Sequence, residues 1–199
     1  MTADRTPMTV QPRRHAREGG HPELTQLGSL CQFISGGTPS TKIADYYDGD
    51  IPWITSADIT DDKITPPRRY ITEEAIESSA TNLVPPGNLL LVTRTGVGKV
   101  AITDTDICIS QDFTGIVPDK NRLDVRFLFY YLKFCQDDLV ANQRGATIQG
   151  ITREVVSTLT IPLPPLEEQQ RIAEVLARAD RLRRLRRAAR ELSAGYLQA

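Results

Sequence analysis

The chain has 199 residues, of which 40% are hydrophobic and 25% charged, and its formal net charge is −1. This composition is typical of a globular protein and excludes a fibrous or wholly disordered chain. No run approaches the roughly 18 uninterrupted apolar residues of a membrane-spanning helix, and the N-terminus lacks the apolar core of a signal peptide. We therefore expect a cytoplasmic protein that does not enter a membrane.

The distribution of charge is uneven along the chain. Residues 1–22 carry four arginines and two acidic residues, and residues 166–199 carry eight arginines and five acidic residues. The middle, residues 23–165, has 12 basic and 18 acidic side chains. Nucleic-acid binding usually depends on basic patches, so the acidic middle argues against a broad nucleic-acid surface and restricts any such contact to particular loops.

Three regions follow from the composition along the chain. Residues 1–22 contain prolines, a glycine pair and scattered arginines without periodicity, which predicts a disordered extension. We expect order to begin near Leu24 and a globular domain to cover residues 23–165. Three prolines between residues 162 and 165 end that domain, because a residue that precedes proline disfavours helical geometry. Residues 166–199 are then expected to form a separate helix.

The first half of the domain is predicted to be mostly extended. Residues 30–34 read as a strand that a turn rich in Gly, Ser and Thr ends. Residues 51–55 form a second extended piece, and Pro52 within it favours the edge of a sheet. Thr72 is expected to cap a short helix that runs through Ala80.

The second half shows a clear hairpin and a helix. Residues 89–93 and 99–103 are apolar and flank a glycine-containing loop, which predicts two antiparallel strands. Another strand is expected over residues 108–117. Asp124 then caps a predicted helix whose apolar residues recur at helical spacing as far as Leu139. Residues 159–163 alternate as a last strand.

The C-terminal segment predicts a long helix with one apolar seam. It has no Gly or Pro between residues 167 and 193, and at about 1.5 Å per residue it would be roughly 40 Å long. The seam repeats every three or four residues, as in a coiled coil. Its members are Ile172, Val175, Ala179, Leu182, Leu185, Ala189 and Leu192. A helix of this length cannot bury its seam on a small domain, so we expect it to pair with another helix.

The hairpin loop at residues 94–99 is the first candidate for chemistry. Its glycines do not have the spacing of a phosphate-binding Walker loop, and a strand follows where that motif needs a helix. One interpretation is a hairpin turn whose glycines supply positive φ. The other is that the glycines allow close approach to a DNA backbone, while Arg94 and Lys99 meet phosphates or base edges.

Three other segments allow more than one interpretation. Residues 142–149 carry amides, Arg144 and Thr147, which suit base reading but also suit a solvated polar loop. The arginine-rich stretch of residues 178–190 could follow phosphates, form the wet face of a coiled coil or contact an acidic partner. The run Asp61-Asp62-Lys63 lacks the strand context of a nuclease. We expect no catalytic residue and no metal site, since both histidines fall within residues 1–22 and the three cysteines fit no ligand pattern.

Four fragments in this order resemble the specificity subunit of type I restriction–modification systems. They are ISGGTP at residues 34–39, GNLLLVTRTGVG at 87–98, ISQD at 109–112 and IPLPPLEEQQRI at 161–172. Each fragment alone is a weak signal, and the last is the most specific. The resemblance covers about residues 24–197.

The resemblance implies an α+β fold, with a mixed or antiparallel sheet in a target-recognition domain followed by one coiled-coil-forming helix. It implies double-stranded DNA as ligand, a methyltransferase subunit as partner and, where present, a motor–nuclease restriction subunit. S-adenosylmethionine would be bound by that methyltransferase, and this chain would need no cofactor. The residues then expected to contact DNA are Ser35, Gly37, Thr38, Arg94, Thr95, Gly96, Lys99, Arg144, Thr147 and Gln149.

The chain departs from the family in size, because members carry two recognition domains and two spacer helices. We expect a half-length form that either self-associates through its helix or is a truncated gene product. A symmetric homodimer would read a target with two-fold symmetry. Two other hypotheses stay open: an adaptor that binds only protein, and the recognition fragment of a split methyltransferase–nuclease.

Overall fold

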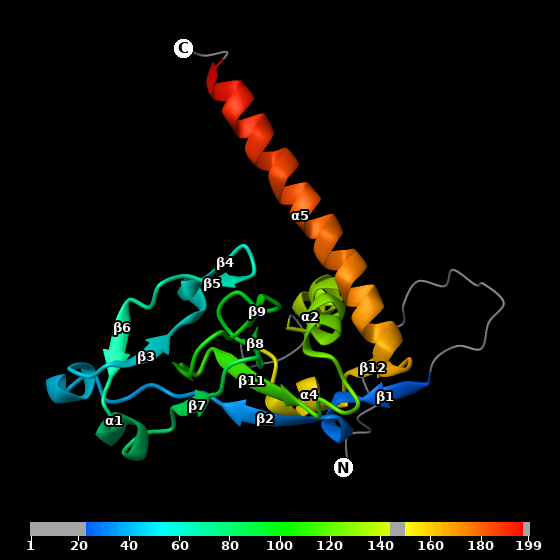
Figure 1. Cartoon of the computed structure of the whole chain (residues 1–199). Helices are drawn as coiled ribbons and strands as arrows, with labels where there is room; N and C mark the ends of the chain where they lie inside the picture. The colour runs from blue at the N-terminus through cyan, green and yellow to red at the C-terminus, as the bar shows by residue number, and fades with distance from the viewer. Residues whose placement is uncertain (1–22, 144–149, 197–199) are drawn as a thin grey trace.

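Two four-stranded sheets form the frame of the domain in the computed structural model, which describes residues 23–143 and 150–196. One sheet is antiparallel throughout, and its strands in spatial order are β2 (Cys31–Ser35), β11 (Phe113–Pro118), β8 (Leu89–Val92) and β9 (Val100–Ile102). The other is mixed, in the order β6 (Arg69–Ile71), β3 (Ile51–Ile54), β10 (Ile107–Ile109) and β7 (Asn82–Val84). Only its β3–β10 pair is parallel. The expected α+β class with a mixed or antiparallel sheet is confirmed (Figure 1).

Two small ribbons and several short helices complete the described residues. The ribbons are β1 (Leu24–Gln26) with β12 (Thr160–Pro162) and β4 (Ile59–Thr60) with β5 (Lys63–Ile64). The helices of the domain are α1 (Glu73–Glu77), α2 (Val125–Phe134), α3 (Gln136–Gln143) and α4 (Arg153–Thr158). Single 3₁₀ turns are η1 (Leu27–Ser29), η2 (Ala44–Tyr47) and η3 (Ser56–Asp58). The β1–β12 ribbon brings the start and the end of the domain together.

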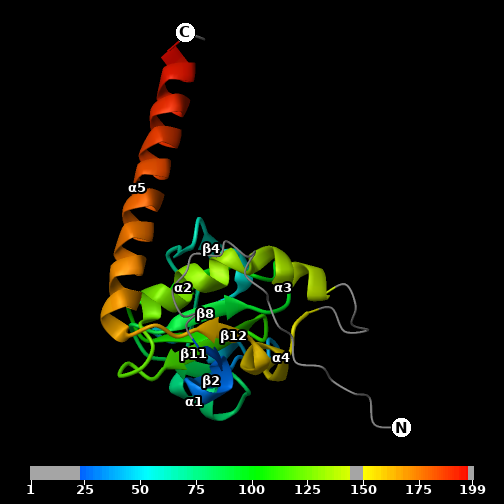
Figure 2. The same cartoon turned by 90° about the vertical axis from the view of Figure 1, so that its right-hand side faces the viewer.

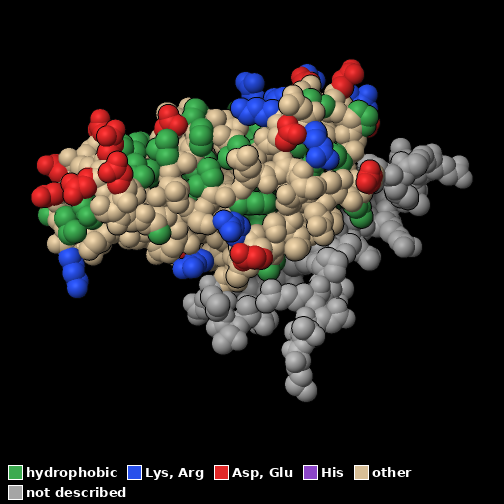
Figure 3. Space-filling model, turned by 90° about the horizontal axis from the view of Figure 1, so that it is seen from below, with side chains coloured by type: hydrophobic (Ala, Val, Ile, Leu, Met, Phe, Trp, Pro, Cys, Tyr) green, Lys and Arg blue, Asp and Glu red, His purple; other side chains and the backbone are tan. Residues whose placement is uncertain are grey.

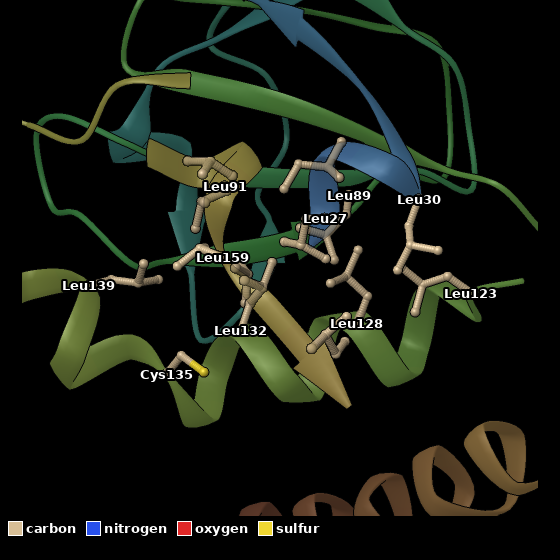
Figure 4. Packing of buried hydrophobic residues seen from close by; sticks show 14 of the residues in the cluster. Leu27, Leu30, Leu89, Leu91, Leu123, Leu128, Leu132, Cys135, Leu139 and Leu159 are labelled. Atoms are coloured by element: carbon tan, nitrogen blue, oxygen red, sulfur yellow. The ribbon is translucent and has the colours of Figure 1, made fainter. Parts of the chain in front are cut away.

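β8 lies at the centre of the core because it is covered on both faces. All four of its residues are fully buried. Successive side chains of a strand point to opposite faces. Leu89 and Leu91 therefore join the cluster under α2, whereas Leu90 and Val92 join the cluster between the two sheets. Figure 4 shows Leu128 and Leu132 on the face of α2 that points toward β8. An uninterrupted apolar run is what such a doubly covered strand requires.

The local predictions of capped helices are confirmed. The Thr72 side chain accepts a hydrogen bond from the Ala75 backbone N–H at 3.2 Å, and α1 begins directly after Thr72. α1 ends at Glu77, so it is shorter than expected. Asp124 accepts hydrogen bonds from two backbone N–H groups at the start of α2. The predicted helix that follows is broken for one residue at Cys135, where α2 gives way to α3.

Two predictions about strands are wrong, and one helix was not predicted. β3 is not an edge strand, since β6 and β10 pair with its two sides; Pro52 itself has a register partner only in β6, which explains how proline is tolerated there. The strand expected over residues 108–117 is two strands in different sheets, separated by a turn in which the Phe113 N–H donates to the Ser110 carbonyl. The helix α4 has no counterpart among the predictions.

α5 (Leu166–Tyr196) is a single helix that leaves the domain and points away from it (Figures 1 and 2). Its first turns pack on the domain, where Gln169 and Ala173 are fully buried. In the predicted seam, Ile172 and Ala179 are half-buried, and the exposed members are Val175, Leu182, Leu185, Ala189 and Leu192. The seam is thus open along most of its length in a single chain. No helix among the described residues combines the length and apolarity that crossing a membrane would require.

Candidate functional site

A hollow of about 220 Å³ lies where four parts of the chain meet. They are the end of β2, the residues that follow β8, the turn between β10 and β11, and the start of α4. The polar side chains in its wall come from Ser35, Thr93, Arg94, Gln111, Thr114, Thr152 and Arg153. Two of these, Ser35 and Arg94, are predicted DNA-contacting residues that lie 59 positions apart in the sequence. The sheet pairing of β2 and β8 with β11 brings them together.

Asp112 holds the hairpin loop in place at this hollow. Its carbonyl oxygen accepts hydrogen bonds from the backbone N–H groups of Thr93, at 2.7 Å, and Arg94, at 3.3 Å. Its carboxylate accepts from the Thr95 hydroxyl at 3.2 Å. The predicted residue Thr95 therefore orients the loop through Asp112. Arg94 and Thr95 are exposed, so their side chains remain accessible from solvent.

The turn after β2 is fixed to the same segment by a side-chain contact. The Thr38 hydroxyl donates to the side-chain oxygen of Gln111. This bond uses the side-chain oxygen of Gln111, so its amide N–H₂ group remains as a donor. Thr38 is exposed beside it. Amide and guanidinium groups are the side chains that pair with base edges in the major groove of DNA. The hollow thus presents both kinds of donor from separate elements.

Gly37, one of the residues predicted to contact DNA, is buried. Its N–H donates to the Ile109 carbonyl at 2.9 Å, and its carbonyl accepts from the Trp53 indole N–H at 3.1 Å. A Cβ at residue 37 would lie 2.3 Å from the Ala80 carbonyl carbon. Close packing against the backbone of Ala80 therefore accounts for the absence of a side chain at Gly37, and its predicted contact with DNA stays a prediction.

Lys99 lies away from Arg94, although both flank the hairpin loop. Its ammonium group is 3.4 Å from the carbonyl oxygen of Ile59 and 3.5 Å from that of Ser56. This places Lys99 against the β4–β5 ribbon, outside the wall of the hollow. Arg94 and Lys99 therefore lie in different surroundings, and their contact with DNA stays a prediction. Gly96, in the hairpin loop, is exposed and has φ of +86°, a conformation that this turn requires and that glycine adopts readily.

The chain re-enters the described region beside Arg94. The Ile151 N–H donates to the Thr93 carbonyl at 2.7 Å, and Gly150 has φ of +138°. A Cβ on Gly150 would lie 2.6 Å from the Thr93 carbonyl oxygen, so glycine is needed for this approach. The predicted residues Arg144, Thr147 and Gln149 lie outside the described residues, as does the predicted extension over residues 1–22.

One group of exposed acidic side chains lies at the end of the domain that carries η2 and α1 (Figure 3). Exposed members of this acidic end are Asp45, Asp48, Asp50, Glu73, Glu74 and Glu77. Arg94 and Arg153 are also exposed, but in the hollow. Six of the 18 acidic side chains of residues 23–165 thus lie at this acidic end. Among the described residues, no group of acidic, His and Cys side chains has a metal-binding arrangement.

Sequence reasoning missed Gln111 and Arg153 as site residues. Gln111 is part of the ISQD fragment that carries the family resemblance. The single strand predicted over residues 108–117 gave no reason to expect its side chain to be exposed. The turn that breaks this strand places Gln111 in the wall of the hollow. Arg153 begins α4, whose existence was not predicted. The signal for it was Thr152, a capping residue followed by an acidic first turn.

An α+β domain with a polar hollow made by loops, followed by a long helix with an open seam, has the architecture expected for a specificity subunit. The chain belongs to the family described as the type I restriction modification DNA specificity domain, whose model matches residues 23–191.

Relatives of known sequence or structure agree with this assignment. The type I restriction enzyme MjaIX specificity subunit of Methanocaldococcus jannaschii is 33% identical over 165 residues, which cover 80% of this chain and 38% of the relative. The HsdS subunit from Thermoanaerobacter tengcongensis superposes with a TM-score of 0.70 at 26% identity, over 89% of this chain and 42% of that one. A further solved chain, from work on "complex assembly" and "conformational transition of the type I R-M system", has a TM-score of 0.75 at 28% identity, over 92% of this chain and 44% of that chain. This chain spans about two fifths of the length of the curated relatives it matches.

Proposed function

We propose that this chain is a sequence-specific DNA-recognition subunit of a type I restriction–modification system. It reads one part of a target with the side chains at the hollow and directs a methyltransferase subunit, and a restriction subunit where one is present, to that target. The observation that carries the proposal is the convergence of Ser35, Arg94, Gln111 and Arg153, from four parts of the chain, in a member of the DNA specificity family.

The chain is proposed to be non-catalytic. The chemistry at the hollow supports this, because its wall offers amide, hydroxyl and guanidinium groups but no carboxylate or thiol that lines it. Such groups hydrogen-bond bases and phosphates, and this holds for the part of the wall that the described residues form. In this proposal the methyltransferase partner binds S-adenosylmethionine, and this chain supplies the choice of sequence.

Self-association through α5 is the second part of the proposal. The open seam supports it, since Leu182 and Leu185 are each 58% exposed and Leu192 is 67% exposed. Large apolar side chains in a row on one helix favour a partner helix that covers them. Two copies joined in this way hold two recognition domains, and a two-fold symmetric pair reads two identical half-sites.

The test is to map methylated sites in cells that produce the chain with the methyltransferase of the same system. Arg94→Gln and Arg153→Gln remove one cation each from the hollow, and Arg178→Gln removes an exposed cation from α5 as a matched control. Loss of a base contact of about 1–3 kcal/mol corresponds to about a 5- to 150-fold loss of methylation at the target. We expect this loss for Arg94→Gln and Arg153→Gln, in complexes that assemble normally, and no change for Arg178→Gln.

An adaptor that binds only protein gives a different result. Its hollow variants would either leave methylation unchanged in intact complexes or abolish the complex itself. Either result would overturn the assignment of DNA recognition to this hollow. A purified chain that methylates DNA alone would overturn its non-catalytic role.

A further inference from the structure

The tip of the β4–β5 ribbon meets α2 and α5 at a group of charges outside the DNA-recognition hollow. Asp61 and Asp62 form the two-residue turn of this ribbon, with φ of +49° and +62°. Two-residue hairpin turns of this kind need positive φ at both positions, and Asp tolerates it better than most residues. The turn therefore presents two adjacent carboxylates at its tip, which accounts for the acidic pair without nuclease chemistry.

Lys133 of α2 connects three elements through this charge group. Its Nζ lies 2.6 Å from Asp62 Oδ2 and 3.1 Å from Asp180 Oδ2 of α5. All three side chains are at least 70% covered, with exposed fractions of 25%, 29% and 16% for Lys133, Asp62 and Asp180. The ammonium group also lies 5.4 Å from the centre of the Phe129 ring, which favours a cation there. We name Lys133, Asp62 and Asp180 the ionic bracket.

The lysine of the bracket remains charged despite its environment. Burial lowers the pKa of Lys133, but hydrogen bonds and charges from Asp62 and Asp180 outweigh burial and hold that pKa above its ordinary value. The charges that face it from the neighbouring elements include Asp61 and Arg187, whose side chains approach to 3.9 Å and are both exposed. Partly covered charges are screened less by salt than exposed ones. The ionic bracket is therefore a stronger contact than the exposed pair of Asp61 and Arg187.

The ionic bracket lies far enough along α5 to affect the direction of the helix. The first anchor is Gln169, which is fully buried and whose side chain bonds the Asp124 N–H and two carbonyl groups, at 2.8 to 2.9 Å. Asp180 is 11 residues further along, about 16 Å at 1.5 Å per residue. Ala173, which is also fully buried, lies within about one turn of Gln169, so Asp180 supplies a more distant anchor, and two anchors at this separation set the direction of the helix.

We propose that the ionic bracket fixes the angle between α5 and the recognition domain and so determines which separation of half-sites the dimer accepts. This inference rests on the proposed function, because it needs two domains joined by their helices. Lys133 is then a positioning residue: it acts through α5 and does not touch DNA.

The size of the effect follows from the length of the helix. From Gln169 to the end of α5 is roughly 40 Å at 1.5 Å per residue, so a swing of about 10° moves its far end by about 7 Å. Successive base pairs are about 3.4 Å apart along DNA, so this swing corresponds to about two base pairs. An unbracketed helix would therefore accept half-sites over a range of separations.

The first experiment measures the angle of the helix without DNA. Spin labels are placed on Thr41→Cys in the domain and Ser193→Cys on α5, both exposed, and labelled chain is diluted with a tenfold excess of unlabelled chain. Burial raises the pKa of the Cys31 thiol to about 12, and Cys108 and Cys135 are buried, so labelling favours the new sites. We expect a narrow distance distribution that Lys133→Met broadens at least twofold. Lys133→Arg, which keeps the charge, should restore most of it, and Arg178→Gln should leave it narrow.

The second experiment measures spacing on DNA. The complex of full chain and methyltransferase methylates a library in which two half-sites are separated by different numbers of base pairs. The wild type should favour one separation, and Lys133→Met should accept neighbouring separations with a preference reduced at least fivefold. Should Lys133→Met fold poorly, the pair Asp62→Asn and Asp180→Asn removes the same contacts by a different route.

The outcomes separate this inference from the proposed function. Unchanged distance distributions and unchanged spacing in the bracket variants overturn the inference, while the sequence preference tested with Arg94→Gln and Arg153→Gln stands. A wild type that prefers sequence but no separation also overturns it. A wild-type complex that methylates DNA without any sequence preference overturns the proposed function instead.

Discussion

The domain and α5 differ in what covers their apolar side chains. In the domain, β8 is buried on both faces by other elements of the same chain. In α5, burial is complete only near Gln169 and Ala173, and beyond Asp180 the described side chains are exposed. A long helix rich in Ala, Leu and Arg forms readily from local propensity, so α5 does not need the domain to be helical. The domain is thus stabilised from within the chain, whereas most of the seam of α5 is exposed in a single chain.

The largest effect that separates the two regions should come from charge in the open seam. Leu182→Asp combined with Leu185→Asp places two carboxylates where a partner helix would pack. We expect the association constant of the homodimer to fall more than about 1,000-fold, or about 4 kcal/mol, because a charge buried in an apolar seam has no partner. Analytical ultracentrifugation measures the association, and thermal unfolding of the domain should stay unchanged.

Two exposed arginines of the same helix provide the matched control. Arg181→Asp combined with Arg186→Asp changes charge on α5 outside the seam. This pair should leave most of the association intact. A wild-type chain that stays monomeric at high concentration would show that the seam is covered by something other than a second copy.

A single leucine in each region should show the next largest difference. Leu128 of α2 is fully buried in the core under β8, whereas Leu192 of α5 is 67% exposed. Leu128→Ala should lower the free energy of unfolding by about 2–5 kcal/mol, because it leaves a cavity in a packed core. Leu192→Ala should change it by less than about 0.5 kcal/mol in dilute, monomeric protein.

Urea unfolding at micromolar and at high protein concentration distinguishes the two leucines further. A stability loss for Leu192→Ala that appears only at high concentration is expected if the seam is buried on self-association. A large loss in the dilute monomer would instead mean that α5 folds back on its own domain. That result would contradict the direction of α5 away from the domain in Figures 1 and 2.

The parts of the fold that sequence predicted well are those set by neighbouring residues. The caps at Thr72 and Asp124, the hairpin of β8 and β9 and the length of α5 each depend on a few adjacent positions. Glycine, proline and capping residues act over the same short range. These features were therefore visible without knowledge of the pairing of distant strands.

The parts that sequence did not predict depend on contacts across the chain. Nothing near Pro52 indicates that β10, more than 50 residues later, pairs with β3. The candidate site shows the same limit: Ser35 and Arg94 were predicted from their turns, but Gln111 joins them only because the strand before it belongs to a different sheet from the strand after it. The burial of Gly37 against Ala80 was invisible for the same reason.

The smallest predicted effect compares an ion pair of the domain whose carboxylate is covered, Asp58 with Arg68, with an exposed pair of α5. The side chain of Asp58 is 4% exposed and accepts a hydrogen bond from Arg68 Nε at 2.6 Å and two more from Thr55, at 2.8 and 2.9 Å. Burial raises the pKa of Asp58, but the bonds from Arg68 and Thr55 outweigh burial and lower it below its ordinary value. Removing hydrogen bonds to a charged group costs about 1.5–3 kcal/mol, so Asp58→Asn should destabilise the domain by this amount at pH 7.

The dependence on pH gives this prediction its sign. A carboxyl whose pKa is lower in the folded than in the unfolded protein stabilises the fold above the unfolded value of about 3.9, and this contribution is lost as the pH falls through the folded pKa. The difference in unfolding free energy between wild type and Asp58→Asn should therefore be constant from pH 7 to about pH 5 and shrink below about pH 4.

Glu174→Gln is the matched change on α5, where Glu174 is 57% exposed beside Arg178. An exposed pair of this kind contributes about 0.3–0.5 kcal/mol. Urea titrations of both variants across this pH range measure the two losses of unfolding free energy. An equal loss for both variants at pH 7 would show that the burial of Asp58 adds nothing to the strength of its ion pair.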